Sequence, residues 1–87
     1  MSDRQRHFVY VLNCANKYLY TGYTVDLPRR LLQHRRGIGS KFTRSHLPVE
    51  LVYSEAFRSR SLALKREFAI KKLPRAKKLL LIAKSKN

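Results

Sequence analysis

Five side chains of this sequence could act together on a phosphodiester bond: Tyr10, Tyr20, Arg30, His34 and Glu67. An arginine can hold a phosphate through two charge-assisted hydrogen bonds. A carboxylate can hold a divalent metal ion, and a tyrosine or a histidine can accept a proton from water. Phosphodiester hydrolysis needs all three kinds of group, so these residue types predict that reaction if the fold brings them together.

The first element that could position them is a β-hairpin. Alternating β-prone residues predict a strand over residues 7–13, and β-prone residues resume over residues 18–23 after the turn-forming stretch NCANK. A turn centred on Ala15 would place Tyr10 opposite Tyr20. The two phenols would then stand side by side on one face of the sheet.

The second element is a helix predicted over residues 27–35. An aspartate precedes it as a good N-cap, and a proline in its first turn is tolerated. Leu27, Leu31 and His34 fall at i, i+4 and i+7 and form an inward stripe, with Arg30 on its flank. We therefore expect Arg30 to be the arginine of this helix that is held in place.

The remaining chain should supply a loop, a strand and two helices. Residues 37–48 contain two glycines and a proline without a consistent period, which predicts a functional loop. Alternation predicts a third strand over residues 49–55, and composition predicts helices over residues 59–73 and from 75 to about 84. The order β-β-α-β-α-α predicts an α/β fold with a small sheet, in which the direction of the third strand is undetermined.

Composition and charge indicate which class of molecule the protein binds. The 87 residues suffice for one domain, expected over residues 7–84 between a flexible arm (1–6) and a C-terminal tail (85–87). Lys and Arg number 20 against 5 Asp and Glu, and the formal net charge of +15 favours nucleic acid as the partner. The basic residues do not lie opposite a broad apolar helix face, so we expect no membrane binding.

Cysteine content and the lengths of the apolar runs predict the location of the protein. A single cysteine, Cys14, cannot form an intrachain disulfide, and no run approaches the length of a membrane span. We expect a cytoplasmic protein that is a monomer or a weak dimer.

Glu67 is the most informative of the acidic residues. On the helix predicted over residues 59–73 it shares a partly apolar side with Ala63 at i−4 and Ile70 at i+3. One explanation is an ion pair with Lys71 at i+4. The other is a magnesium ligand, because Mg²⁺ binds proteins through one or two carboxylates and completes its coordination with water and phosphate oxygens. A two-metal cluster is not expected from so few acids.

Two side chains compete for the role of proton acceptor. Tyr10 would need its pKa lowered by roughly three units from about 10, a change that the net charge, an arginine and a metal ion would all favour. His34 has an ordinary pKa near 6.5 and needs no such shift. Tyr20 would orient water or substrate by a hydrogen bond. Taken singly, the tyrosines more often serve packing or base stacking, Arg30 a phosphate clamp or a salt bridge, and His34 a structural role. Only their combination predicts catalysis.

The ordered set of these residues resembles the GIY-YIG nuclease domain, and specifically the small stand-alone bacterial proteins of that superfamily. The two halves of the motif appear as Phe8-Val9-Tyr10 and Tyr20-Thr21-Gly22. Arg30 follows ten positions after the second tyrosine, with His34 four positions later. Further similarity lies in Lys41-Phe42-Thr43-Arg44, Leu51-Val52-Tyr53 and Arg66-Glu67. Two positions differ, since Phe8 replaces a glycine of the motif and Thr21 replaces an isoleucine.

The resemblance implies a three-stranded antiparallel sheet flanked by helices, and hydrolysis of DNA with Mg²⁺ or Mn²⁺. It implies Tyr10 as the general base or its relay, and Tyr20 as a positioning group. It also implies Arg30 on the scissile phosphate and Glu67 on the metal ion. Further contacts with nucleic acid are expected from Gly22, Arg29, Arg35, Arg36, Lys41, Thr43 and Arg44.

The expected substrate follows from what the chain offers for recognition. With no added DNA-binding domain expected, selection should depend on DNA structure, such as single-stranded, flapped or branched ends, as in DNA repair or recombination. The competing hypothesis is a non-catalytic module that binds DNA or RNA, in which the tyrosines stack on bases. Both hypotheses predict salt-dependent binding, so only cleavage separates them.

Overall fold

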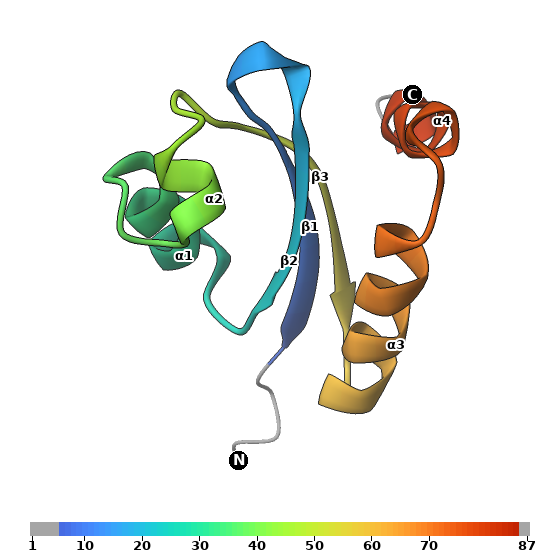
Figure 1. Cartoon of the computed structure of the whole chain (residues 1–87). Coiled ribbons are helices and arrows are strands. Elements are labelled where there is room, and N and C mark those ends of the chain that lie inside the picture. The colour runs from blue at the N-terminus through green and yellow to red at the C-terminus, as the bar shows by residue number, and fades with distance from the viewer. Residues whose placement is uncertain (1–5, 86–87) are drawn as a thin grey trace.

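The computed structural model describes residues 6–85 (Figure 1). Strands β1 (His7–Asn13), β2 (Leu19–Thr24) and β3 (Glu50–Phe57) form an antiparallel sheet in the order β2-β1-β3. Helices α1 (Leu27–Arg35) and α2 (Lys41–Arg44) cover one face, and α3 (Arg60–Lys71) and α4 (Arg75–Ser85) cover the other (Figure 1). The predicted small antiparallel sheet flanked by helices is confirmed.

Two predictions concern the ends of the chain and membrane insertion. The expected arm (1–6) and tail (85–87) lie outside the described residues except for Arg6 and Ser85, and Ser85 belongs to α4. None of the helices formed by residues 6–85 has the length and apolar character that crossing a bilayer requires.

The hairpin register differs from the one predicted. Tyr10 pairs with Gly22 rather than with Tyr20. The connection is longer than a turn centred on Ala15, because the 3-10 turn Ala15–Lys17 (η2) contains two residues with positive φ. The predicted pairing was therefore wrong, although both phenols lie on the same face and their ring centroids are 6.4 Å apart.

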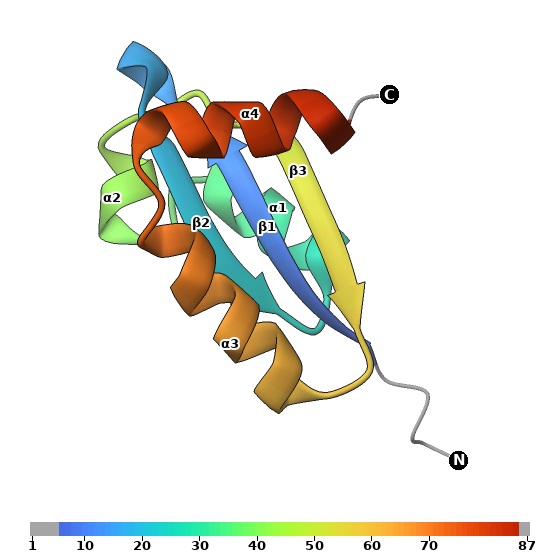
Figure 2. The ribbon, with the colours of Figure 1, turned by 90° about the vertical axis from the view of Figure 1, so that its right-hand side faces the viewer.

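The central strand β1 serves both faces through alternate side chains. Val9 and Val11 point toward α3 and α4, where they pack with Ala63, Ile70 and Ile82 in a buried apolar core. Figure 2 shows α3 beside β2 and α4 crossing the sheet near the hairpin turn. This face therefore consists mainly of aliphatic packing, which holds the edge of β2 in place.

The opposite face carries the residues of the predicted site. α1 has the predicted boundaries, and Asp26 caps it by accepting a hydrogen bond from the backbone N–H of Arg29 at 3.2 Å. Leu27 and Leu31 pack with the buried cluster around Tyr10, and His34 is completely buried. The inward stripe predicted for this helix is thus the surface that meets β1.

The segment after α1 contains a helix where an irregular loop was predicted. α2 forms a single turn, and Ser40 caps it by accepting a hydrogen bond from the backbone N–H of Thr43 at 3.1 Å. One helical turn is too short to produce a recognisable period, so the loop prediction was wrong for these residues. β3, α3 and α4 lie where expected, within two residues at each end.

Candidate active site

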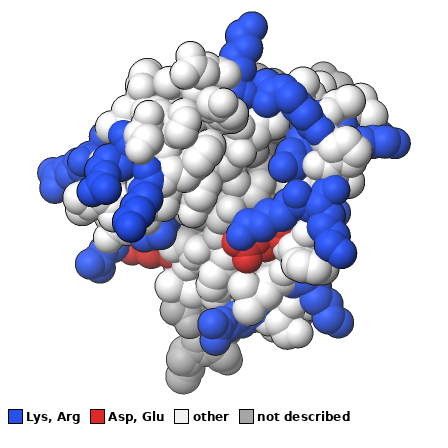
Figure 3. All heavy atoms as spheres, viewed as in Figure 1, with Lys and Arg blue, Asp and Glu red and all other residues white. Residues whose placement is uncertain are grey.

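The candidate site lies along β2, the outer strand of the sheet on the side away from β3. α1 and α2 border this edge from one face of the sheet, and α3 and α4 border it from the other (Figure 1). In the same view, Figure 3 shows Lys and Arg side chains gathered on both sides of a largely uncharged strip, with acidic atoms at its borders. We call the surface over β2 between these basic side chains the edge cleft.

Two hollows open along this cleft. The arginine hollow, of about 530 Å³, is lined by Tyr23, Thr24, Val25, Asp26, Arg29, Arg30 and Gln33. The lysine hollow, of about 260 Å³, is lined by Leu19, Tyr20, Thr21, Phe42, Lys71 and Lys78. The second hollow joins residues from both faces of the sheet, since Phe42 belongs to α2, Lys71 to α3 and Lys78 to α4.

Tyr10, Tyr20 and His34 meet on the α1 face of the sheet. The hydroxyl of Tyr10 lies 2.8 Å from Nε2 of His34, and the rings of Tyr20 and His34 have centroids 5.2 Å apart. Tyr10 can reach this position because its cross-strand partner is Gly22. A Cβ atom at Gly22 would collide with the Tyr10 phenol, so only glycine allows the ring to cross β2.

A hydrogen-bonded chain extends inward from Tyr10. Nδ1 of His34 lies 2.8 Å from Oγ1 of Thr43, whose hydroxyl donates to the carbonyl of Ser40 at 3.3 Å. Oγ1 of Thr43 is then free to accept the Nδ1–H of His34, which leaves Nε2 as a bare acceptor for the hydroxyl of Tyr10. Thr43 was expected to contact nucleic acid, but its side chain is completely buried and holds His34 instead.

Burial sets the protonation of both candidate proton acceptors. It raises the pKa of Tyr10 to about 12, and the nearby Arg30 guanidinium only partly opposes this. Burial, together with the positive charge of Arg30, lowers the pKa of His34 to about 4. The expected lowering of the Tyr10 pKa by a nearby arginine is present, but loss of hydration outweighs it and the net change is upward. Both groups are neutral at pH 7.

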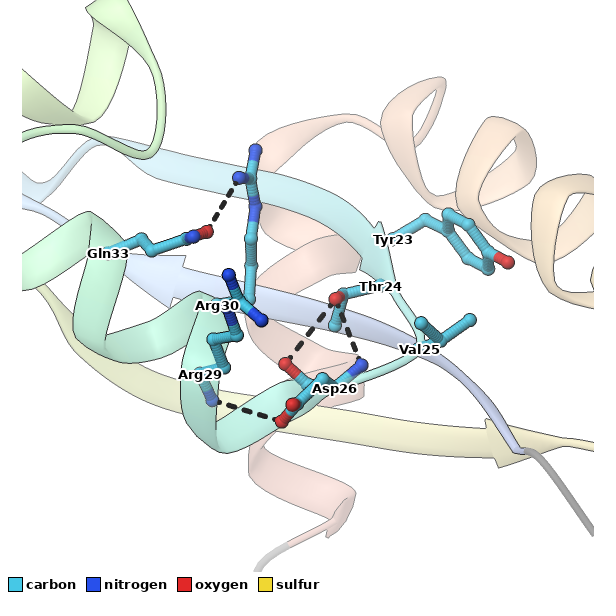
Figure 4. A pocket seen from close by; sticks show the side chains of 7 residues that line it. All are labelled: Tyr23, Thr24, Val25, Asp26, Arg29, Arg30 and Gln33. Atoms are coloured by element: carbon cyan, nitrogen blue, oxygen red, sulfur yellow. Dashed lines mark hydrogen bonds between the residues drawn. The ribbon is translucent and has the colours of Figure 1, made fainter.

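Arg30 is held in place at the wall of the arginine hollow. One terminal nitrogen donates to Oε1 of Gln33 at 3.0 Å, and the other donates to the carbonyl of Gly39 at 2.9 Å. Figure 4 shows the first of these bonds, with Tyr23 pointing away from the pair. These bonds fix the guanidinium plane and leave further N–H donors for a phosphate oxygen.

Glu67 belongs to α3, on the other face of the sheet, and is not among the residues that line the two hollows. Its side chain is 17% exposed, and its Oε2 lies 3.2 Å from Nζ of Lys71. The ion pair that the sequence offered as one explanation of Glu67 is therefore formed. The carboxylate is also close enough that its charge contributes to the raised pKa of Tyr10.

The donor set around the cleft suits a metal ion held by few protein ligands. Among residues 6–85, no three His, Cys, Asp or Glu side chains gather into a cluster that could enclose a metal ion. Glu67 could hold a divalent cation through its carboxylate, with water and phosphate oxygens completing the coordination.

The remaining expected contacts with nucleic acid have different surroundings. Gly22 is buried beneath the phenol of Tyr10. The exposed basic side chains on α1, at its end and on α2 are Arg29, Arg35, Arg36, Lys41 and Arg44. Of these, Arg29 lines the arginine hollow. The basic wall on the α1 side is therefore made by side chains that remain open to solvent.

Sequence reasoning missed an aromatic group beside the lysine hollow. Phe42 and His46 are stacked, with ring centroids 4.3 Å apart, and Tyr18 lies edge-on to both of them. The spacing of Phe42 and His46 at i and i+4 was a signal for this contact. It went unused because the segment was predicted to be irregular. Lys78 was also missed, since nothing in the sequence placed α4 near β2.

Comparison with known proteins places this chain in a family. The model of the GIY-YIG catalytic domain matches residues 6–79. A UPF0213 protein of Natronomonas pharaonis is 54% identical over 77 residues, which cover 88% of this chain and 91% of that protein. A UPF0213 protein of Staphylococcus saprophyticus is 46% identical over 78 residues, which cover 90% of this chain and 95% of that protein.

Solved structures agree with these relatives. The solution NMR structure of a UPF0213 protein from Bacillus halodurans matches with a TM-score of 0.60 and 42% identity, over 90% of this chain and 83% of that one. A solution NMR structure of a protein from E. faecalis matches with a TM-score of 0.64 and 39% identity, over 97% and 90% of the two chains. The chain belongs to the GIY-YIG nuclease superfamily, beside the small stand-alone UPF0213 proteins.

Proposed function

We propose that this protein is an endonuclease that hydrolyses DNA phosphodiester bonds with Mg²⁺ or Mn²⁺ and selects single-stranded, flapped or branched DNA. The observation that carries the proposal is the buried hydrogen-bonded chain from Tyr10 through His34 to Thr43. It lies beside Tyr20, which lines the lysine hollow. Arg30 and Glu67 lie close enough for their charges to act on Tyr10. A structure-selective nuclease of this kind would serve DNA repair or recombination.

In the proposed reaction Tyr10 is a proton relay and His34 is the acceptor. Deprotonating Tyr10 to a phenolate at pH 7 would cost roughly 7 kcal/mol, because the pKa of Tyr10, about 12, lies some five units above that pH. A relay replaces this cost with the smaller one of protonating His34, whose pKa is about 4. A water molecule gives its proton to the oxygen of Tyr10 while the hydroxyl proton of Tyr10 moves to Nε2 of His34. The approach of an anionic phosphate favours the imidazolium that forms.

The other residues bind and orient the phosphate. Arg30 holds its oxygens and stabilises the charge that develops as the bond to phosphorus forms. Tyr20 orients the water or the substrate from beside His34. Glu67 would hold the Mg²⁺ or Mn²⁺ ion, which when bound supplies charge neutralisation at the phosphate and the leaving oxygen. Displacement of Lys71 from Glu67 would free the carboxylate for this role.

Basic side chains along the cleft bind flanking phosphates. Arg29, Lys41 and Arg44 are exposed and belong to elements that border β2. Contacts with phosphate carry no direct information about base sequence, so the proposed selectivity depends on the shape of the substrate. The test compares cleavage of single-stranded, flapped, branched and duplex oligonucleotides of matched sequence. Equal cleavage of the duplex would contradict the proposed selectivity.

The decisive experiment measures metal-dependent cleavage by variants of the site. Tyr10→Phe, Arg30→Ala and Glu67→Gln should each reduce the rate by about 100-fold or more. The matched controls are Tyr53→Phe, which removes a buried hydroxyl on the other face, and Glu50→Gln on the exposed start of β3. Both controls should cleave like the wild type. A Glu67→Gln variant with the wild-type rate would refute the metal assignment.

A second candidate function is a non-catalytic module that binds DNA or RNA. One observation favours it, because Tyr10 and His34 are both neutral and hydrogen-bonded to each other at pH 7. In that case the net charge of +15 supplies the affinity and the tyrosines serve packing. A wild-type protein that binds nucleic acid but cleaves none of the DNA or RNA substrates with Mg²⁺ or Mn²⁺ would establish this alternative.

A further inference from the structure

We infer that the lysine hollow and the aromatic rings beside it bind one unpaired nucleobase of a nucleic-acid strand, with the neighbouring phosphates on Lys71 and Lys78. The inference rests on the proposed function only in taking nucleic acid as the ligand. It does not require that the strand be cleaved. It assigns a role to Phe42, His46 and Lys78, which the proposed reaction leaves unused.

The rings form a nearly parallel series at the mouth of the hollow. The ring of Phe42 lies 4.3 Å from that of His46 at an interplanar angle of 22°, and 6.1 Å from that of Tyr20 at 18°. Tyr18 supports the series edge-on, with its centroid 4.8 Å from His46. Tyr18 and Phe42 remain 49% and 37% exposed. Packing alone does not account for a contiguous aromatic surface that is left in water.

The hollow has the size and lining that a single heterocycle requires. Its volume of about 260 Å³ lies just below the roughly 300–1,000 Å³ typical of sites for drug-sized ligands. Tyr20, Thr21 and Phe42 are among the residues that line it. The buried hydroxyl of Thr21 lacks a hydrogen-bond partner among residues 6–85, so the lining contains an unsatisfied polar atom.

Charge identifies the class of ligand. The wall opposite the aromatic rings is formed by Lys71 and Lys78, from two different helices. A base offers a flat π-surface for the rings, and the phosphate on either side of it offers negative charge for the lysines. Bases in a duplex are already stacked and paired, so only an unpaired base can enter. The lysine hollow and the aromatic rings beside it, which together we call the subsite, would therefore favour single-stranded regions over duplex.

The subsite adjoins the proposed reaction centre through Tyr20. This residue lines the lysine hollow and also lies 5.2 Å from the ring of His34. A base held against Tyr20 and Phe42 would fix the strand next to the phosphate that Arg30 binds. Cleavage would then require an unpaired nucleotide beside the scissile bond.

The test measures binding in EDTA, so that cleavage does not contribute. The probe is a single-stranded DNA oligonucleotide with one 2-aminopurine, whose fluorescence is quenched on stacking. Phe42→Leu keeps an apolar side chain but removes the ring, and should weaken binding about 5- to 150-fold and abolish the quenching, since base stacking is worth about 1–3 kcal/mol. Phe68→Leu is the matched control, because Phe68 is 61% exposed on α3, outside the lining of the hollow. It should bind within about twofold of the wild type.

Further measurements keep the inference testable if Phe42→Leu fails to fold. His46→Leu removes the ring at the other end of the series and should also reduce quenching. An abasic site scanned along the oligonucleotide should weaken binding by the wild type at one position. Lys71→Met and Lys78→Met should each reduce the slope of log affinity against log salt by about 0.7.

The outcomes separate this inference from the proposed function. Unchanged binding and quenching in Phe42→Leu and His46→Leu, or equal wild-type affinity for abasic and intact strands, would overturn the subsite even if the protein cleaves DNA. If the wild-type protein quenches the 2-aminopurine but cleaves no substrate with any metal ion, the nuclease proposal is refuted and the subsite is retained. If the affinity for an acidic peptide exceeds that for the oligonucleotide, the ligand class is wrong.

Discussion

The two faces of the sheet share the central strand β1 but bury different kinds of side chain. Toward α3 and α4 the fully buried residues are aliphatic, such as Val9, Val11 and Ile70. Toward α1 and α2, Tyr10 and His34 are buried just as deeply, but each is hydrogen-bonded to a neighbour. An apolar face tolerates repacking, whereas a buried polar chain permits one arrangement only.

The difference is one of position rather than of polar content. The α3 face also carries a polar group, in which Glu55 accepts hydrogen bonds from Tyr53 at 2.6 Å and Arg66 at 3.1 Å. Its charged members stay at the rim, since the side chains of Arg66 and Glu55 are 37% and 39% exposed. The α1 face instead withdraws Tyr10 and His34 from water. The free energy lost by removing these polar groups from water therefore arises on the face where reactivity is proposed.

The largest effect should follow from pushing Tyr10 out of its place. In Gly22→Ala, the new Cβ would collide with the phenol and break its hydrogen bond to His34. Cleavage should fall by about 100-fold or more, as when a positioned proton-transfer group is lost. The assay is single-turnover cleavage, with circular dichroism to confirm folding. Ser54→Ala, at the exposed position of β3 that pairs with Tyr10, is the control. A Gly22→Ala variant as active as this control would contradict the geometry.

The next largest effect should be on stability and come from the opposite face. Ile70 is completely buried between α3 and the sheet, so Ile70→Ala should reduce the free energy of unfolding by about 2–5 kcal/mol. Urea denaturation measures this change, and Leu64→Ala on the exposed side of the same helix is the control. Cleavage per folded molecule should stay near the wild-type value. A strong loss of activity in the folded fraction would show that the two faces are not separate in function.

Much of this comparison could be predicted from sequence patterns. The alternation in residues 7–13 predicted that β1 has two different faces, and the stripe ending at His34 predicted which side of α1 is buried. These predictions succeeded because each depends on a local repeat. The capping residue Asp26 likewise fixed the start of α1 within a few positions.

The parts that failed depend on longer distances or on single turns. The hairpin register depends on positive φ at Asn16 and Lys17, which composition alone does not specify. The pKa of Tyr10 depends on how completely α1 covers it, and hydration loss outweighed the charges counted from the sequence. The closeness of Glu67 to Tyr10 depends on α3 reaching the edge of β2 from the other face.

The buried histidine should make the stability depend on pH in a defined range. The pKa of His34 is about 4 in the folded protein, against about 6.5 when unfolded. As the pH falls from 6.5 to 4 the unfolded chain takes up a proton that the folded chain does not, so up to about 3 kcal/mol of stability is lost. Urea denaturation at several pH values across this range gives the free energy of unfolding as a function of pH. This free energy should change less with pH in His34→Gln than in His46→Gln. Identical slopes in the two variants would mean that His34 is not withdrawn from water.

The smallest effect should come from the charged pair at the rim of the α3 face. A double-mutant cycle of Arg66→Met and Glu55→Gln should give a coupling of about 0.2–1 kcal/mol, because both side chains are partly exposed and screened by salt. A cycle of His34→Gln and Thr43→Val should give a larger coupling that salt leaves unchanged, since both side chains are completely buried. If the two couplings were equal and equally sensitive to salt, burial would not distinguish the polar groups of the two faces. The two faces would then not differ in function on the basis of burial, with one sustaining the fold and the other holding a reactive chain.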